Sequence, residues 1–247
     1  MPIVLLNVGT DTIGNSLSCV IHTMQEELRH HDCTLVVTAK GRHDMPELRR
    51  TLAPLAVVDI TRESAGVRDD GDWGFFRGHQ AGFPFHSRVQ LQYLADLGHR
   101  HVGFAVPAGD IGVFGRRRID HAHRAALELG LEPLTVVRLS MDPDPRIRTE
   151  AVRALVRESD VTAVAALDDD VALAFLASMA HLGYSAPDDL AVIGFDDEHQ
   201  GYLWEPALTT VRIDTAAYGK RAAGLAVGAA AHDWIEAPSE VVERASG

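Results

Sequence analysis

The chain lacks several sequence features, and each absence excludes a class of protein. It contains only two cysteines, Cys19 and Cys33, too few and too widely spaced for a disulfide framework or a CxxC redox site. No apolar run approaches the roughly 20 residues that a membrane-spanning helix needs. The opening residues, MPIVLLNVGT, lack the charged segment and cleavage site of a signal peptide, so we expect a cytoplasmic protein.

Basic charge is also scarce. Lys and Arg total 23 against 35 Asp and Glu, which gives a net charge of −12. A surface that binds phosphate backbones usually carries a basic patch. The one dense basic cluster is Arg116–Arg118. Direct nucleic-acid binding by this chain is therefore not expected, and neither is a membrane partner.

Motifs of catalysis are missing as well. There is no GxSxG elbow, and the paired histidines do not have the spacing of a zinc-binding helix. Gly9–Ser16 has P-loop spacing, but Asn15 stands where the phosphate-binding lysine belongs. We interpret this segment as a strand-to-helix turn whose amides can face a polar ligand. We expect no enzymatic activity, no cofactor and no metal.

What the chain does contain is a repeated alternation of helix, glycine and strand. Three expected helices end in Leu-Gly pairs, at Gly98, Gly130 and Gly183, where a residue without Cβ best adopts a left-handed closing conformation. A strand-like run follows each glycine: HVGFAV, LTVVRL and LAVIGF. This rhythm predicts an α/β fold with parallel sheets and crossover helices.

The N-terminal part shows the same alternation. The pattern predicts strands over Ile3–Val8, Thr34–Thr38 and Leu55–Ile60. It predicts helices over Ile13–His30 and Pro46–Leu52. Thr61–Phe85 has no clear period, and a helix is expected again from about His86 to Leu97. Near the C-terminus we expect a helix after Ile213 and a last strand in VVERAS.

The most informative stretch is Val161–Ile213. Its two apolar strands, VTAVAAL and LAVIGF, run directly into Asp168–Asp170 and Asp196–Asp197. Groups beyond the carboxyl ends of strands line the ligand crevice of an open α/β sheet. Aspartates at a helix start also cap free amides. Both interpretations can hold, because three residues can divide the tasks. Trp204, a little further on, fits ligand stacking and core packing equally well.

These segments resemble the ligand-sensing domain of the LacI/GalR family of bacterial transcription regulators. The run AALDDDVALAFLASMAHLGYSAPDDLAVIGFDD resembles the family's ND-to-GFDD pattern, and PALTTV resembles its PxLTTV segment. YLADLGHRHVGF resembles its LGHR segment, and VVERASG resembles its last strand. The similarity is strong over 86–213 and at the C-terminus, weaker over 1–60 and poor over 61–85.

The resemblance implies a type I periplasmic-binding-protein-like fold: two doubly wound parallel-sheet lobes joined by three crossovers, with the ligand between them. We expect an N-terminal lobe of 1–98 plus 209–232 and a C-terminal lobe of 99–208 plus 233–247. The family's helix-turn-helix is absent from this sequence, so operator DNA would be bound only through a domain outside it. The family also implies a homodimer.

Transferred residue by residue, the resemblance implies that Asp168 and Asp196 contact the ligand. The neighbouring aspartates, Asp169, Asp170 and Asp197, are expected to cap and brace. Arg117 falls near the arginine that binds effector oxygens in the family, and either Arg116 or Arg118 could hold that place instead.

The resemblance also implies apolar and first-lobe contacts. Trp204 and Phe85 are expected to cover an apolar face of the ligand. Thr10, Asp11 and Ile13 are expected to form the ligand edge of the first lobe. The run Phe83-Pro84-Phe85 replaces a polar residue that many sugar-sensing members have, which weakens the case for a sugar.

We therefore expect an effector-sensing domain of a LacI/GalR-type regulator. It would bind a small polar ligand, a sugar or related metabolite, and control DNA binding allosterically. A free-standing solute-binding protein for sugar uptake shares the fold and is the first alternative. An enzyme on the same fold is the second, since a fold does not fix a function.

Overall fold

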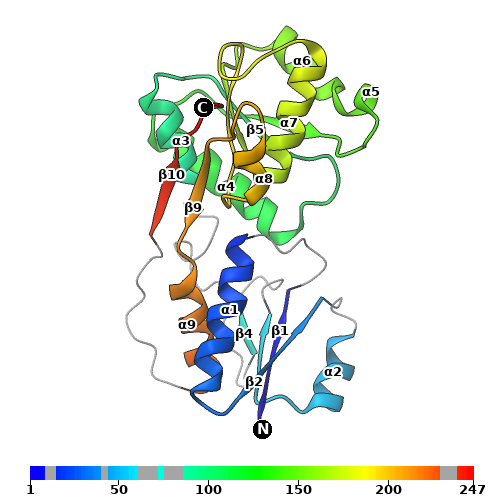
Figure 1. Cartoon of the computed structure of the whole chain (residues 1–247), viewed down its shortest axis with the longest axis vertical. Helices are drawn as coiled ribbons and strands as arrows, with labels where there is room; N and C mark the ends of the chain where they lie inside the picture. The colour runs from blue at the N-terminus through cyan, green and yellow to red at the C-terminus, as the bar shows by residue number, and fades with distance from the viewer. Residues whose placement is uncertain (9–14, 40–43, 60–71, 75–85, 229–237) are drawn as a thin grey trace. The chain divides into compact units, whose positions relative to one another are not determined.

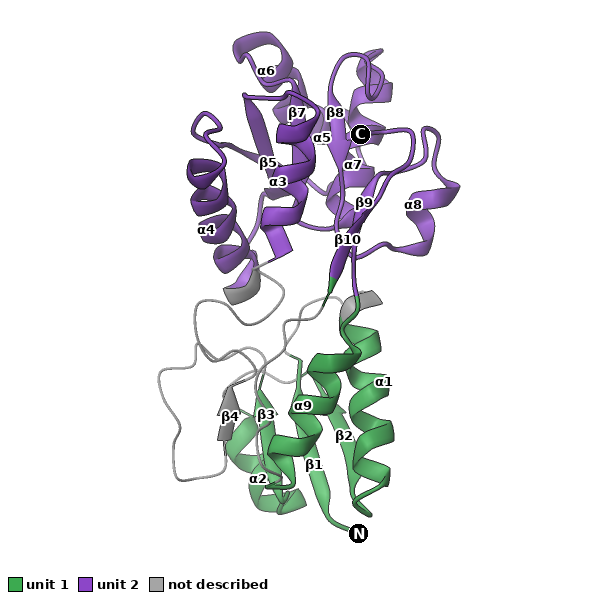
Figure 2. Cartoon of the chain, turned by 90° about the vertical axis from the view of Figure 1, so that its left-hand side faces the viewer, with its two compact units in different colours: residues 1–82, 214–238 green, residues 83–213, 239–247 purple. Residues whose placement is uncertain are grey.

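The chain folds as an α/β protein of two compact units. The computed structural model describes residues 1–8, 15–39, 44–59, 72–74, 86–228 and 238–247 (Figure 1). Unit 1 comprises Met1–Gly82 and Asp214–Pro238, and unit 2 comprises Phe83–Ile213 and Ser239–Gly247 (Figure 2). The chain therefore passes between the units three times, and the predicted fold of two parallel-sheet lobes with three crossovers is confirmed.

The borders of the units differ from the expected lobes, 1–98 plus 209–232 and 99–208 plus 233–247. Helix α3 (Ser87–Asp96) was placed in the first lobe by those borders, but it packs on α4 (Gly112–Glu128) and β10 (Ser239–Val242) in unit 2. Strand β9 (Thr210–Ile213) pairs with β10 and so also belongs to unit 2. The difference arises because side-chain packing of α3, which no sequence pattern displays, decides its unit.

Unit 1 is built on a four-stranded parallel sheet with the order β2-β1-β3-β4. Its strands are β1 (Ile3–Asn7), β2 (Thr34–Thr38), β3 (Ala56–Asp59) and β4 (Asp72–Gly74). Its helices are α1 (Asn15–Arg29), α2 (Met45–Leu52) and α9 (Ala216–Ala226). The strands predicted for β1, β2 and β3 are confirmed to within one residue at each end.

Helices α1 and α9 pack closely because of one glycine. They lie side by side in unit 1 (Figures 1 and 2). A Cβ placed on Gly219 of α9 would lie 2.7 Å from the Val20 carbonyl oxygen and 2.8 Å from Thr23 Cβ of α1. The glycine that weakens α9 as an isolated helix therefore permits its contact with α1.

Unit 2 contains a second four-stranded parallel sheet, with the order β6-β5-β7-β8. Its strands are β5 (Val102–Pro107), β6 (Thr135–Leu139), β7 (Ala163–Ala166) and β8 (Ala191–Ile193). Its remaining helices are α5 (Pro145–Arg148), α6 (Glu150–Glu158), α7 (Asp169–Leu182) and α8 (His199–Leu203). β9 and β10 form an antiparallel ribbon, which joins the sheet through a parallel bridge between Ile193 and Thr209.

The three Leu-Gly helix endings close as predicted. Gly98, Gly130 and Gly183 have φ of +95°, +66° and +82°. After α7, the Gly183 amide donates to the Ala180 carbonyl at 3.1 Å and the Tyr184 amide to the Met179 carbonyl at 2.9 Å. These bonds satisfy the last carbonyls of the helix and turn the chain toward the next strand. Among the described residues, no helix is both long and apolar enough to cross a membrane.

Replacing Gly219 by alanine tests the close packing of α1 and α9. Alanine is the better helix former by about 1 kcal/mol, so an open site would gain stability. We expect Gly219→Ala instead to lose roughly 1–3 kcal/mol of unfolding free energy in urea titrations, since the added methyl overlaps backbone atoms of α1. Gly109→Ala is the control, because a Cβ there meets nothing within 4 Å. Equal stability of the two variants would contradict the packing described.

Candidate ligand-binding site

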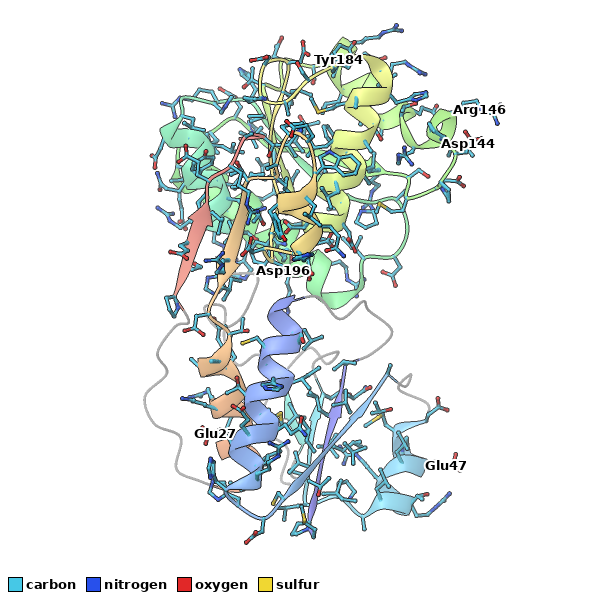
Figure 3. All side chains as sticks on the ribbon, in the orientation of Figure 1. Glu27, Glu47, Asp144, Arg146, Tyr184 and Asp196 are labelled. Atoms are coloured by element: carbon cyan, nitrogen blue, oxygen red, sulfur yellow. The ribbon has the colours of Figure 1, made fainter. Side chains whose placement is uncertain are left out.

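Asp168 and Asp196 come from adjacent strand ends in unit 2. β7 ends at Ala166 and β8 ends at Ile193, and the two strands pair in parallel. In the strand order β6-β5-β7-β8, connections leave in opposite directions at β5 and β7, so a topological switch point lies there. Asp196 lies at the carboxyl end of this sheet (Figure 3). The predicted convergence of the two aspartate clusters at one sheet edge within unit 2 is therefore confirmed.

The cap of α7 is Asp168. Its Oδ1 accepts a hydrogen bond from the Val171 amide at 2.8 Å, and its backbone is extended, as is usual for an N-cap. We had expected Asp169 and Asp170 to take this task. Burial raises the pKa of the Asp168 carboxyl above its usual value, although the hydrogen bond from the Val171 amide and the charge of Arg118 act in the opposite direction. Asp168 therefore has two roles: it caps α7, and its carboxyl group interacts with the charge of Arg118.

Asp169 links the segments that follow the strands through buried hydrogen bonds. Its side chain is fully buried and accepts hydrogen bonds from Thr210 Oγ1 and from the Glu198 amide, both at 2.6 Å. Its own amide donates to the Phe195 carbonyl at 3.0 Å. A Cβ on Gly194 would overlap the Asp169 carboxylate, so glycine is required there. Burial raises the pKa of Asp169 to about 7.

The turn after β8 has an unusual backbone. Asp196 and Asp197 have φ of +100° and +52°, values that residues with side chains rarely adopt. Such conformations cost roughly 1–3 kcal/mol each and persist where surrounding contacts enforce them. Asp197 supplies those contacts: Arg244 Nη2 donates to it at 2.5 Å and Arg212 Nε at 2.7 Å. Asp197 therefore braces, as predicted, and holds Asp196 at the edge.

Arg118 supplies the positive charge of this region. It lies on α4, is 4% exposed, and its guanidinium is 3.5 Å from the centroid of the Phe195 ring. Its Nη2 donates to Gln90 Oε1 at 2.7 Å and its Nε to Ser87 Oγ at 3.2 Å. Burial lowers its pKa to about 10, although the charges of Asp196, Asp168 and Asp169 act in the opposite direction. Arg118 therefore stays protonated at neutral pH.

Of the three arginines that the resemblance leaves open, with Arg117 as its first choice, Arg118 is the one whose charge interacts with the carboxylates. Consecutive residues of a helix point about 100° apart, so only one of the three arginines can face the sheet edge squarely. Arg116 pairs with the exposed Asp110 at 3.1 Å, and the side chain of Arg117 is half-buried. The charge triplet in the sequence shows an arginine at this place but not which one.

Sequence reasoning missed Gln90 altogether. This α3 side chain is fully buried, and its Nε2 donates to the Gly194 carbonyl at 2.7 Å and to the Ala166 carbonyl at 2.9 Å. The available signal was its position. With Ser87, Leu91 and Leu94 it forms the buried i, i+3, i+4, i+7 face of α3, where a polar residue needs partners.

The remaining predicted contacts lie at the surface or beyond the described residues. Trp204 follows α8 and is 36% exposed, next to the exposed Tyr202 and Leu203. Thr10, Asp11, Ile13 and Phe85 lie outside the described residues. Within the part of the chain that the structure describes, no group of three or more His, Cys, Asp or Glu side chains could hold a metal ion.

The raised pKa of Asp169 predicts a particular pH dependence. A carboxyl whose pKa rises from 3.8 to about 7 on folding stabilises the fold fully below pH 3.8 and loses that contribution as pH rises to about 7. The unfolding free energy should therefore fall between pH 4 and pH 8. We expect this fall to be smaller in Asp169→Asn by roughly a few kcal/mol, measured by denaturant titrations across that pH range. Asp170→Asn, an exposed neighbour on the same helix turn, is the control and should keep the decline. If the unfolding free energy of Asp169→Asn falls with pH as steeply as that of the wild type, Asp169 is ionised throughout this pH range and the prediction is wrong.

Solved structures share this fold over the whole chain. A LacI family transcriptional regulator from Silicibacter pomeroyi superposes with a TM-score of 0.76 at 18% identity, covering 100% of this chain and 98% of that one. A LacI family regulator from Lactobacillus casei with bound glucose gives a TM-score of 0.71 at 17% identity, covering 100% of both chains. At these identities the likeness establishes the fold.

Several curated relatives are transcriptional regulators. The HTH-type transcriptional repressor PurR of Mannheimia succiniciproducens is 27% identical over 221 residues, which is 87% of this chain and 64% of the relative. A regulator from the aml 5' region of Streptomyces limosus is 31% identical over 156 residues, 60% of this chain and 43% of the relative. The chain thus spans less than two thirds of the length of these relatives.

A family model covers most of unit 2. The model of the periplasmic binding protein-like domain matches residues 91–246, which include Arg118 and both aspartate clusters. The sheet order, the two-unit fold and the relatives all agree with this match. The chain therefore belongs to the periplasmic binding protein-like domain family, and it shares its fold with solved structures of LacI family regulators.

Proposed function

We propose that the chain is the effector-sensing domain of a LacI/GalR-type transcriptional regulator and that it binds a small polar ligand at the carboxyl edge of the unit 2 sheet. The observation that carries this proposal is the group formed by Asp168, Asp196 and Arg118. Two carboxylates on neighbouring strand ends lie in the field of one buried, protonated guanidinium.

The chemistry of this group suits a ligand rich in hydroxyl groups. Carboxylates accept strong hydrogen bonds, and a guanidinium donates them, so a molecule that both donates and accepts can satisfy both. Glucose, which is bound in the Lactobacillus casei neighbour, is a molecule of this kind. A sugar or a related metabolite is therefore the ligand class that we propose for this chain.

The strained turn after β8 is a second reason to place the ligand at this end of the sheet. Left-handed conformations of residues with side chains cluster at ligand-binding positions, where surrounding contacts hold them. Here two successive aspartates adopt them, and Arg244 and Arg212 hold the second. Burial alone would raise the pKa of Asp197, but the bonds and charges of these arginines outweigh it and hold that pKa below its usual range.

Control of DNA binding is the regulatory part of the proposal. In a full-length regulator, a ligand that favours one conformation of the sensing domain shifts the affinity for operator DNA. By linkage, DNA then shifts the affinity for the ligand by the same factor. The curated relatives named as repressors support this role.

A thermal-shift panel tests ligand binding at this edge. We expect one class among sugars, nucleosides and their phosphates to raise the melting temperature, because a ligand at 100 times its Kd adds about 2.7 kcal/mol of stability. Asp196→Asn should abolish that shift, whereas Asp170→Asn, a matched change at an exposed position of α7, should keep it.

Two outcomes would overturn the proposal. One is a panel in which every ligand class leaves the melting temperature unchanged. The other is a ligand shift that Asp196→Asn keeps in full, which would place binding elsewhere on the chain.

A further inference from the structure

We propose that Gln90 is the positioning residue of the candidate ligand-binding site. From α3, its one amide group holds the two strand ends that lead to Asp168 and Asp196 and also anchors the guanidinium of Arg118. This role deepens the proposed ligand site and rests on it, whereas its test needs no effector.

The donor side of the amide sets the spacing of the strand ends. Gln90 Nε2 donates to the Ala166 carbonyl at 2.9 Å and to the Gly194 carbonyl at 2.7 Å. Each carbonyl stands two residues before a candidate ligand carboxylate, Asp168 in one case and Asp196 in the other. An NH₂ group has two protons, and these are the two short bonds; a third, longer contact of 3.5 Å reaches the Ile193 carbonyl of the same β8 strand end. The distance between the two strand ends is thereby tied to one planar group.

The acceptor side of the same amide anchors Arg118. Gln90 Oε1 accepts from Arg118 Nη2 at 2.7 Å, and Ser87 Oγ, one turn earlier on α3, accepts from Nε at 3.2 Å. The guanidinium is thus held at Nε and at Nη2, while its face stacks on Phe195. An arginine side chain otherwise has many rotamers, so this anchoring fixes the position of the charge that interacts with the carboxylates.

Complete burial makes this arrangement sensitive to substitution. Gln90 and Ser87 are both 0% exposed, and Arg118 is 4% exposed, so water replaces none of these bonds easily. A residue that only filled space at position 90 would leave two carbonyls and a guanidinium without their partner. Gln90 is therefore more than a packing residue: it links the geometry of the carboxylates to the orientation of the cation.

Chemical modification of Arg118 separates positioning from a merely structural role. Phenylglyoxal reacts with accessible guanidinium groups, and peptide mass spectrometry reports each arginine separately. We expect wild-type Arg118 to resist modification while Arg116 and Arg212, whose side chains are 55% and 53% exposed, react. In Gln90→Met, which has similar length but no amide, Arg118 should react at least about tenfold faster than in the wild type, since it has lost its anchor.

A second variant keeps only the acceptor. Gln90→Glu can still accept from Arg118 Nη2 but cannot donate to both carbonyls. We expect lower melting temperatures for both variants and a protected Arg118 in Gln90→Glu alone. Leu94→Ala, a cavity-forming change on the same buried face of α3, is the control for general destabilisation and should leave Arg118 protected.

Equal protection of Arg118 in Gln90→Met and wild type would overturn the proposal, as would equal reactivity in Gln90→Met and Gln90→Glu. Gln90→Ala, which leaves room for water at the carbonyls, replaces Gln90→Met in this comparison if that variant does not fold. If the ligand panel fails while Arg118 is modified faster in Gln90→Met than in the wild type, the ligand site is refuted, and only the anchoring of Arg118 by Gln90 is supported.

Discussion

The buried positive charge of Arg118 is the constraint on which the edge of the unit 2 sheet depends. Three carboxylates, those of Asp168, Asp169 and Asp196, act on this one guanidinium. Removing one partner of a buried charge pair typically costs about 3–5 kcal/mol, because the other charge is left uncompensated. Without a cation here, carboxylates on two neighbouring strand ends would repel each other and favour protonation or separation of the strands.

The residues around Arg118 fall into two groups: some fix the strand ends by hydrogen bonds, and two aspartates lie at the carboxyl end of the sheet. Asp169, Asp197 and Gln90 hold the strand ends, each through hydrogen bonds to a different segment. Asp168 and Asp196 are left at the edge, one at the start of a helix and one on a left-handed turn. This division explains how a cluster of five acidic residues can both stabilise a fold and offer acceptors to a ligand.

Much of the fold could be predicted from the sequence because its signals are local. Glycines that close helices, apolar runs of strand length and aspartates after strands each depend on neighbours within a few residues, and the structure has them where expected. The unit to which α3 belongs could not be predicted, since it depends on packing against α4 and β10. Among the site residues, the sequence predicted both aspartate clusters and an arginine in the triplet 116–118. The choice of Arg118 and the role of Gln90 depend on which helix faces are buried, and long-range contacts decide that.

The central claim is that the edge centred on Arg118 is where the chain recognises its ligand. The most direct measurement compares Arg118→Met with Arg117→Met, two identical changes one residue apart on α4, by titrating each with the ligand class that raises the melting temperature of the wild type. The account predicts that the shift is lost in Arg118→Met and retained in Arg117→Met. A shift retained in a folded Arg118→Met, or lost only in Arg117→Met, would contradict it.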